Sequence, residues 1–239
     1  MNKKTLKDKK VVILGGTSGF GFATARAAAD AGAQVVIASR SQANVDKALA
    51  ELPAGVTGAT VDVTDEAALD RFFSSLNGLD HLIVTAGDAA PAFNPTTQQA
   101  RHAFEVRFWG VYLSTKAAAP YIRPGGSITL TNGIVAIRPW KGWALTSAVA
   151  GAVESLTRGL ALDLAPIRVN AVCAGVVKTP LWSGMSEQER EAMYADVAKK
   201  LPVGRIGEPE DIAETYLYLI QSGFTTGQVV VIDGGAAIA

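Results

Sequence analysis

The sequence predicts an α/β fold in a single domain, built on a doubly wound parallel sheet of seven strands. Short apolar runs alternate along the chain with longer segments whose apolar residues recur at helical spacing. The composition agrees with this pattern, because 49% hydrophobic and 18% charged residues suit a sheet buried on both faces. We find no internal repeat and no linker in the 239 residues, so we expect one domain over residues 1–239.

The first strand and the glycine-dense turn after it form a candidate nucleotide site. Val11–Leu14 is an apolar run, and a helix is expected after the turn, with Gly32 as its C-terminal cap. Such a turn brings backbone N–H groups and a helix N-terminus against a diphosphate, where side chains would hold the phosphates away. The candidate residues are Gly15, Thr17, Ser18, Gly19, Phe20 and Gly21. The alternative is a glycine-rich turn with a structural role only.

The next three strands are expected to end at the same edge of the sheet, beside this turn. They are Gln34–Ala38, Thr57–Val61 and Leu79–Thr85, and the helices between them have Ser41 and Thr64 as expected caps. The residues that follow these strands, and are therefore candidates for the nucleotide site, are Ser39, Arg40, Asp62, Val63, Ala86 and Gly87.

Arg40 bears on the choice of nucleotide. An acidic residue at the end of the second strand would bind a ribose 2′-hydroxyl, whereas an arginine suits a 2′-phosphate. No Asp or Glu follows that strand before Asp46. The sequence therefore favours NADP(H) over NAD(H); the alternative is that Arg40 is only a surface residue.

The second half of the chain supplies two long helices and three more strands. A helix is expected from Thr96 or Thr97 towards Pro120, and another within Ala144–Ala165, whose many Ala and Gly residues suggest a subunit interface. The strands are expected at Ser127–Thr131, after the Pro124–Gly126 turn, at Ile167–Val172 and at Gln228–Ile232. Pro209 is expected to open the last helix.

Residues 181–201 interrupt the alternation of strands and helices. Ser186 followed by Glu189 is a capping-box signature for a helix that runs to Lys200. A segment inserted after a strand end is well placed to cover a substrate, so we expect a lid here; the alternative is a plain surface helix.

Charge and residue usage exclude several classes of function. The formal net charge is zero, which gives no basic field for nucleic acid or membrane, and the five lysines before Val11 indicate a solvated tail over residues 1–9. No apolar run is long enough to span a membrane or to form a signal peptide, so we expect a cytoplasmic protein. Cys173 lies in an apolar strand, and His81 and His102 lack metal-ligand spacing, so we expect neither a reactive thiol nor a metal.

Several stretches together resemble the short-chain dehydrogenase/reductase family. Leu14–Gly21 is similar to its Thr-Gly-x-x-x-Gly-x-Gly turn, Asp62-Val63 to its adenine-contacting Asp-Val, and Val84–Gly87 to its Asn-Asn-Ala-Gly. The region that in the family holds the nicotinamide carboxamide corresponds to Gly175, Val177 and Thr179. The resemblance runs from about Lys9 to the end. It implies a Rossmann-type fold, a nicotinamide cofactor, a small-molecule substrate, and a homotetramer or homodimer.

The resemblance does not extend to the residues that carry out the family's reaction. That reaction uses Tyr-x-x-x-Lys on the second long helix and a serine before it. With Val153–Leu160 aligned to the family's helix, these tyrosine, lysine and serine positions hold Thr146, Ala150 and Gly133. A threonine hydroxyl is a far weaker acid than tyrosine, and glycine has no side chain. Tyrosine-driven carbonyl reduction is therefore not expected.

Arg107 occupies the position of an asparagine that the family places on the first long helix. We hypothesise that its guanidinium reaches the nicotinamide pocket and binds an anionic substrate or stabilises an alkoxide; the alternative is an ion pair at an interface. Trp140, Lys141 and Trp143 flank the same pocket and form either a substrate wall or helix packing. Two functions stay open: an NADP(H)-dependent oxidoreductase with a non-standard mechanism, and a catalytically silent nucleotide-binding sensor or partner subunit.

Overall fold

A computed structural model of the chain describes residues 5–87 and 95–239. Its centre is one sheet of seven parallel strands, as the sequence predicts, and the strands lie in the order β3-β2-β1-β4-β5-β6-β7. The strands are β1 (Lys10–Leu14), β2 (Gln34–Ser39), β3 (Thr57–Thr60), β4 (Leu79–Val84), β5 (Ile122–Gly133), β6 (Arg168–Ala174) and β7 (Val229–Ile232). The order reverses between β1 and β4, the point at which ligands bind in sheets of this kind.

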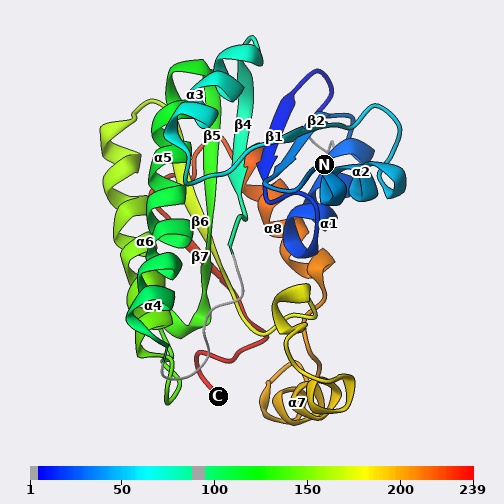
Figure 1. Cartoon of the computed structure of the whole chain (residues 1–239), viewed down its shortest axis with the longest axis vertical. Helices are drawn as coiled ribbons and strands as arrows, with labels where there is room; N and C mark the ends of the chain where they lie inside the picture. Colours follow the sequence, from blue (N-terminus) through cyan, green and yellow to red (C-terminus); the bar gives the residue numbers. More distant parts are fainter. Residues whose placement is uncertain (1–4, 88–94) are drawn as a thin grey trace.

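Helices cover both faces of the sheet (Figure 1). One layer holds α3 (Glu66–Ser75), α4 (Thr97–Phe104), α5 (Gly110–Ala118) and α6 (Ala144–Asp163). The other holds α1 (Gly19–Asp30), α2 (Gln42–Glu51) and α8 (Pro209–Gln221). A further helix, α7 (Glu187–Lys200), follows β6 and stands apart from both layers, at the lower end of the view.

The strands divide their apolar side chains between the two helical layers. In β1, Val12 and Leu14 pack into the core under α3, α5 and α6, whereas Val11 and Ile13 pack into the core under α1 and α8. Successive side chains of a strand point to opposite faces, so a continuous apolar run is what a doubly covered strand requires. Because the strands are parallel, their carboxyl ends, and the residues that follow them, meet at one edge of the sheet.

Three local features differ from the sequence-based expectations. Asp65, and not Thr64, caps α3, because the Asp65 carboxylate accepts a hydrogen bond of 2.9 Å from the Ala68 amide, while the Thr64 hydroxyl donates to Asp62. The Pro124–Gly126 segment does not form a separate turn before the strand. It lies inside β5, which is longer than expected, and the register of β5 with β4 shifts between Leu79 and His81. The first long helix is continuous but contains a π-helical turn, η1 (Glu105–Trp109), between α4 and α5.

The described part of the expected basic tail is attached to the body of the protein. Leu6 is buried, and Lys9 donates a hydrogen bond of 2.9 Å to the carboxylate of Asp80. The same carboxylate accepts from the Lys10 amide at 2.9 Å and from the Arg123 guanidinium at 3.1 Å. These contacts hold the amino end of β1 against β4 and β5. Residues 1–4 lie outside the described part of the chain.

Candidate functional site

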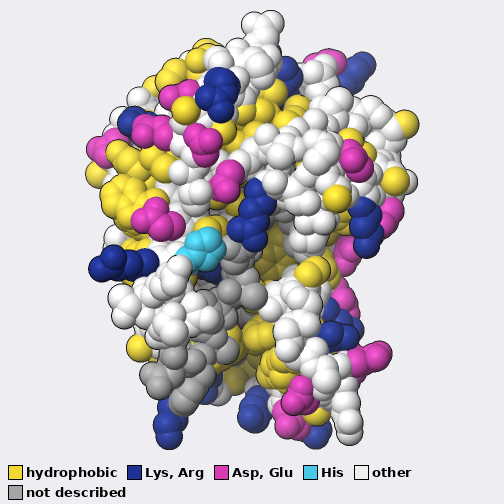
Figure 2. Space-filling model, viewed as in Figure 1, with side chains coloured by type: hydrophobic (Ala, Val, Ile, Leu, Met, Phe, Trp, Pro, Cys, Tyr) yellow, Lys and Arg dark blue, Asp and Glu magenta, His cyan; other side chains and the backbone are white. Residues whose placement is uncertain are grey.

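A cleft of about 540 Å³ runs along the carboxyl ends of β1 to β4. The residues predicted for the nucleotide site that line it are Gly15, Thr17, Ser18, Gly19, Phe20, Gly21, Ser39, Arg40, Asp62, Val63, Ala86, Gly87 and Thr179. Segments far apart in the sequence therefore meet at one edge of the sheet. Figure 2 shows this face of the molecule, which is hollowed in its lower half beside α7 and has hydrophobic side chains on the floor of the hollow.

The glycine turn is packed closely against the end of β4. Gly15 has φ +88°, and a Cβ added to it would lie 2.6 Å from the Ala86 amide nitrogen. The Thr85 hydroxyl lies 3.1 Å from the carbonyl oxygens of both Leu14 and Gly15. Gly15 is therefore required for contact between two backbone segments, a reason that sequence spacing alone does not reveal.

The N-terminus of α1 faces the cleft without a capping side chain. Ser18 is the N-cap residue and makes no side-chain cap hydrogen bond, and no acidic residue lies in the first turn. By contrast, Ser41, Asp65 and Ser186 cap their helices with side chains. The partial positive charge and the N–H groups of the first turn suit a phosphate group, so this end of the cleft fits a dinucleotide.

The far end of the cleft carries charged side chains. Arg40 follows β2 and lies near Asp62, which follows β3. Hydrogen bonds from Thr64 hold the pKa of Asp62 below its usual value against the opposing effect of burial, and the positive charge of Arg40 contributes further. Asp62 is therefore a carboxylate at neutral pH, with the guanidinium beside it.

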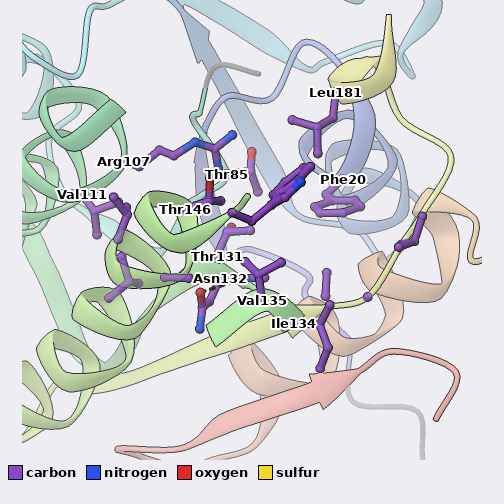
Figure 3. A pocket seen from close by; sticks show the side chains of 18 of the residues that line it. Phe20, Thr85, Arg107, Val111, Thr131, Asn132, Ile134, Val135, Thr146 and Leu181 are labelled. Carbon is purple, nitrogen blue, oxygen red and sulfur yellow. Dashed lines mark hydrogen bonds between the residues drawn. The ribbon is translucent and has the colours of Figure 1, made fainter. Parts of the chain in front are cut away.

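A second cavity, of about 140 Å³, adjoins the cleft and is enclosed mainly by apolar side chains (Figure 3). Gly133 at the end of β5, Thr146 and Ala150 on α6, and Gly175 after β6 all line it. The residues that we assigned to the family's serine, tyrosine and lysine positions thus face one common space. Val177 lines neither the cleft nor this cavity: its side chain is buried, and its carbonyl accepts a hydrogen bond from the indole of Trp182.

Arg107 lies where the cleft and the cavity meet, and it lines both. It sits in the π-helical turn η1, a wider turn that is frequent at functional sites. Its guanidinium packs against Gly87, where an added Cβ would lie 3.3 Å from the guanidinium carbon. In Figure 3 the Arg107 side chain extends towards Thr85, with Thr146 beside it.

The cavity contains very few groups that can exchange protons. Among its described lining residues Arg107 is the one charged side chain, and none is Asp, Glu, His, Cys, Lys or Tyr. The Asn132 amide is engaged in the cavity wall, since its nitrogen donates to Glu154 at 3.0 Å and its oxygen accepts from the Gly133 amide at 2.7 Å. The described lining is suited to holding an apolar group beside one positive charge.

Some lining residues escaped the sequence analysis. In the cleft these are Asn44, Val106, Leu181 and Ser183, and in the cavity Val111, Ile134, Val135, Val149, Val153 and Val176. Thr146, Val149, Ala150 and Val153 recur at helical spacing, so one stripe of α6 was available as a signal once Thr146 was placed in the pocket. Leu181 comes from the segment that we expected to act as a lid.

Other side chains with reactive potential lie elsewhere. Cys173 is buried in β6, and burial raises the pKa of its thiol to about 12, so it is a packing residue. Within the described ranges, no group of three or more His, Cys, Asp or Glu side chains could hold a metal ion. In those same ranges, no helix is both long and apolar enough to cross a membrane.

Comparison with known sequences places relatives along the whole chain. Residues 15–237 match the family model described as Enoyl-(Acyl carrier protein) reductase. The chain is 38% identical over 258 residues to the short-chain dehydrogenase/reductase ucsE of Acremonium sp., covering 98% of this chain and 97% of that protein. It is 35% identical over 254 residues to the short-chain dehydrogenase/reductase malC of Malbranchea aurantiaca, covering 98% and 96%.

Solved structures give the same picture. A small-chain dehydrogenase in complex with NADPH has a TM-score of 0.83 and 36% identity, over 98% of this chain and 100% of that one. The MalC Reductase/Diels-Alderase of Malbranchea aurantiaca has a TM-score of 0.87 and 35% identity, over 96% of each chain. Sequence and structure comparisons therefore agree over nearly the whole chain.

Proposed function

Because the chain belongs to the short-chain dehydrogenase/reductase family, we propose that it binds NADPH and reduces an activated double bond without the tyrosine proton donor of that family. The observation that carries the proposal is the position of Arg107. Arg107 is the one charged side chain in the described lining of the cavity, and it lies where the cavity joins the nucleotide cleft. The positions that align with the family's tyrosine and lysine line the same cavity and hold Thr146 and Ala150.

The preference for NADPH rests on Arg40 and on one relative. Arg40 lies at the end of β2 in the cleft, where a guanidinium can bind a 2′-phosphate. The structural neighbour at 36% identity is a complex with NADPH. Asp62, the acidic residue near Arg40, follows β3 and not β2, so no acidic residue stands at the end of β2 to select a ribose 2′-hydroxyl. We therefore expect tighter binding of NADPH than of NADH.

The side chains that we expect to hold the cofactor follow from the cleft. The first turn of α1, with Thr17 and Ser18, would bind the diphosphate, and Arg40 the 2′-phosphate. Gly175 and Thr179 would lie towards the nicotinamide end. When bound, the cofactor supplies a hydride. The chain itself orients the substrate and stabilises the negative charge that hydride transfer leaves on it.

The cavity's chemistry favours a conjugated carbonyl over a simple ketone. Hydride addition to the β-carbon of an enone leaves an enolate, whose charge is delocalised and less basic than that of an alkoxide. Arg107 can stabilise such an oxyanion electrostatically, but an arginine does not act as an acid. The proton then reaches the substrate from water. An enolate needs a proton donor less than an alkoxide does, which suits a site whose described lining has no carboxyl, imidazole, thiol, ammonium or phenol group.

A second candidate activity uses the same cavity. One relative, at 35% identity, carries the description Reductase/Diels-Alderase. A cycloaddition converts two π bonds into two σ bonds and moves neither hydride nor proton, so it needs a shaped apolar cavity and no acid. The mainly apolar lining here favours it as an activity beside reduction. It is recognised by product formation that persists when NADP⁺ replaces NADPH.

The proposal is tested by two measurements on the purified protein. Titration with NADPH and NADH, followed by protein fluorescence, gives both affinities; NADPH oxidation is then followed against a panel of enones and ketones. We expect binding of NADPH and turnover of at least one enone. Tight binding without turnover of any substrate would favour the silent sensor or partner subunit, and no binding of either nucleotide would overturn the cofactor assignment.

Three further properties concern the oligomeric state, a lid over the substrate and the cellular compartment. We propose a homodimer or homotetramer, supported by the outer face of α6, where a Cβ at Gly151 or Gly159 would meet only open space and Leu162 is 81% exposed. We propose that residues 181–201 cover the bound substrate, since Leu181 and Trp182 line the cavity. We also keep the cytoplasm as the expected compartment, with no nucleic acid or membrane partner.

A further inference from the structure

We propose that the cavity beside Arg107 takes substrates that carry a flat aromatic system of two or more fused rings, bound against a tryptophan wall made of Trp140, Trp143 and Trp182. The inference rests on the proposed function, because it names a substrate class for the same cavity. All three indoles line the cavity, although they are far apart in the chain: Trp140 and Trp143 precede α6, and Trp182 follows β6.

The first two tryptophans are brought together by a tight turn. The Trp143 amide donates a hydrogen bond of 3.0 Å to the Trp140 carbonyl, and Gly142, at the third position of this turn, has φ +86°. Type II turns require a positive φ at that position. The turn leaves the two indoles in edge-to-face contact, with ring centroids 5.1 Å apart. Because Trp143 and Thr146 are three residues apart at the start of α6, they share one side of the helix.

The third tryptophan extends the wall beyond Trp143. Trp182 lies in the short helix η4 (Pro180–Trp182), and its indole N–H donates a hydrogen bond of 3.0 Å to the Val177 carbonyl. Its ring centroid lies 6.3 Å from that of Trp143 at an interplanar angle of 46°. Each of these centroid separations exceeds the width of one six-membered ring, so a ligand that stacks along more than one of the indoles needs more than one ring.

Packing explains only part of each indole. Trp140 and Trp182 pack against a small core of Val176, Tyr194 and Ile206 under α7, but all three wall tryptophans remain half-buried. Each of the three also lines the cavity. Apolar side chains complete the enclosure elsewhere, including Phe20, Ile134, Val135 and Leu181. Among the polar lining side chains, Arg107, Thr85 and Thr146 lie near one another, and Thr131 and Asn132 lie below them in the view (Figure 3).

This distribution specifies the ligand. Indole faces and edges stabilise flat aromatic rings through offset-stacked and edge-to-face contacts, which a saturated ring of equal volume cannot make. A carbonyl group attached to the ring system would point to the polar end, at Arg107. The ligand is thus a fused aromatic group that bears a conjugated carbonyl.

The test measures binding of a defined probe and its saturated counterpart. The probe is 4-(2-naphthyl)but-3-en-2-one, the counterpart carries a decalin in place of the naphthalene, and both are studied by equilibrium dialysis with NADP⁺, which cannot donate hydride. We expect the naphthyl probe to bind about tenfold more tightly than the decalin compound, and W143L to weaken its binding by about tenfold. W143F keeps a ring and should lose less than W143L.

Trp109 provides a matched control. It is the one tryptophan that lines neither the cleft nor the cavity, and 46% of it is exposed. W109L should therefore change the probe's affinity by no more than about twofold. Equal binding of the two compounds, or equal effects of W143L and W109L, would overturn the inference. Thermal unfolding of each variant distinguishes a lost contact from a lost fold, and W143F supplies the comparison if W143L does not fold.

The proposed function and this inference fail in different ways. If the wild-type protein oxidises NADPH with a non-aromatic enone, and the naphthyl probe binds no more tightly than the decalin compound, the reductase assignment stands and the aromatic substrate class is wrong. If the probe binds in a manner that depends on Trp143, but no enone or ketone is reduced, the wall stands and the reductase assignment is wrong.

Discussion

The phenol oxygen of Tyr216 on α8 lies 2.6 Å from the hydroxyl oxygen of Thr131 on β5. The Thr131 hydroxyl also donates a hydrogen bond to the Val84 carbonyl, so Tyr216 must be the donor in the first contact. Tyr216 is fully buried, and burial raises the pKa of its phenol, which therefore stays protonated. Because Thr131 lines both the cleft and the cavity, this chain of hydrogen bonds joins the core under α8 to the site.

We predict that T131V destabilises the protein more than Y216F does. Y216F removes one donor and leaves Thr131 bonded to Val84, which should cost about 1 kcal/mol of unfolding free energy. T131V leaves the Tyr216 hydroxyl buried with no acceptor, which should cost about 1–3 kcal/mol. The double variant should cost less than the sum of the two. Urea unfolding measures all three, and additive costs would show that the two hydroxyls are not coupled.

A second prediction concerns Arg40 and the nucleotide. R40A should weaken NADPH binding by roughly 10- to 100-fold, since a charge-assisted hydrogen bond to phosphate contributes about 1.5–3 kcal/mol, and should change NADH affinity much less. K47A is the matched control, because Lys47 is an exposed cation on the adjoining helix α2 and does not line the cleft. Fluorescence titration measures both affinities. Equal losses for the two nucleotides would mean that Arg40 does not contact a 2′-phosphate.

The strands of the sheet and the glycine turn could be predicted from the sequence because each is specified by residues that are close together in the chain. The apolar run Val11–Leu14, the glycine turn and the capping box of Ser186 and Glu189 each depend on neighbouring residues, and each lies in the expected place. The choice of Thr64 as the cap of α3 was wrong: Asp caps helices somewhat better than Thr, and it is the Asp65 carboxylate that faces the Ala68 amide.

The cavity was harder to predict because distant segments make it. Trp182 meets Trp143 only after β6 has returned the chain to the same edge of the sheet, and the contact of Tyr216 with Thr131 joins β5 to α8. No spacing rule connects such residues. Arg107 was found through its position in the first long helix, but the π-helical turn that carries it has no sequence signature that we recognised.

A third prediction concerns acid stability and His81. This side chain is 5% exposed, its Nδ1 lies 2.9 Å from the Ser127 hydroxyl, and burial lowers its pKa from 6.5 to about 4, against the opposing charge of Asp80. A lowered pKa means that the unfolded chain binds the proton first. The stabilisation is therefore present above pH 6.5 and is lost as the pH falls towards 4, by up to about 3 kcal/mol.

H81N tests this dependence, because asparagine can keep the contact with Ser127 and does not titrate. The difference in unfolding free energy between the wild type and H81N should shift against the wild type as the pH falls from 6.5 to 4. H102N removes the other histidine, which is exposed, and should keep the wild-type pH dependence. Parallel curves for the wild type and H81N in urea unfolding at several pH values would contradict the prediction.

The last prediction concerns Arg107 and the reaction. R107M keeps most of the side-chain length and removes the guanidinium, so the oxyanion left by hydride transfer would lose its electrostatic partner. Loss of one such group lowers kcat by about 10²–10³-fold in enzymes where it has been removed, and we expect a loss of that order in enone reduction.

Because Arg107 also borders the cleft, NADPH affinity is measured separately, and we expect it to change by less than about tenfold. R101M is the control, since Arg101 is exposed on α4 and lines neither the cleft nor the cavity. A variant R107M that binds NADPH and keeps wild-type kcat would show that the guanidinium packs against Gly87 for structural reasons, and the oxyanion would then need another partner.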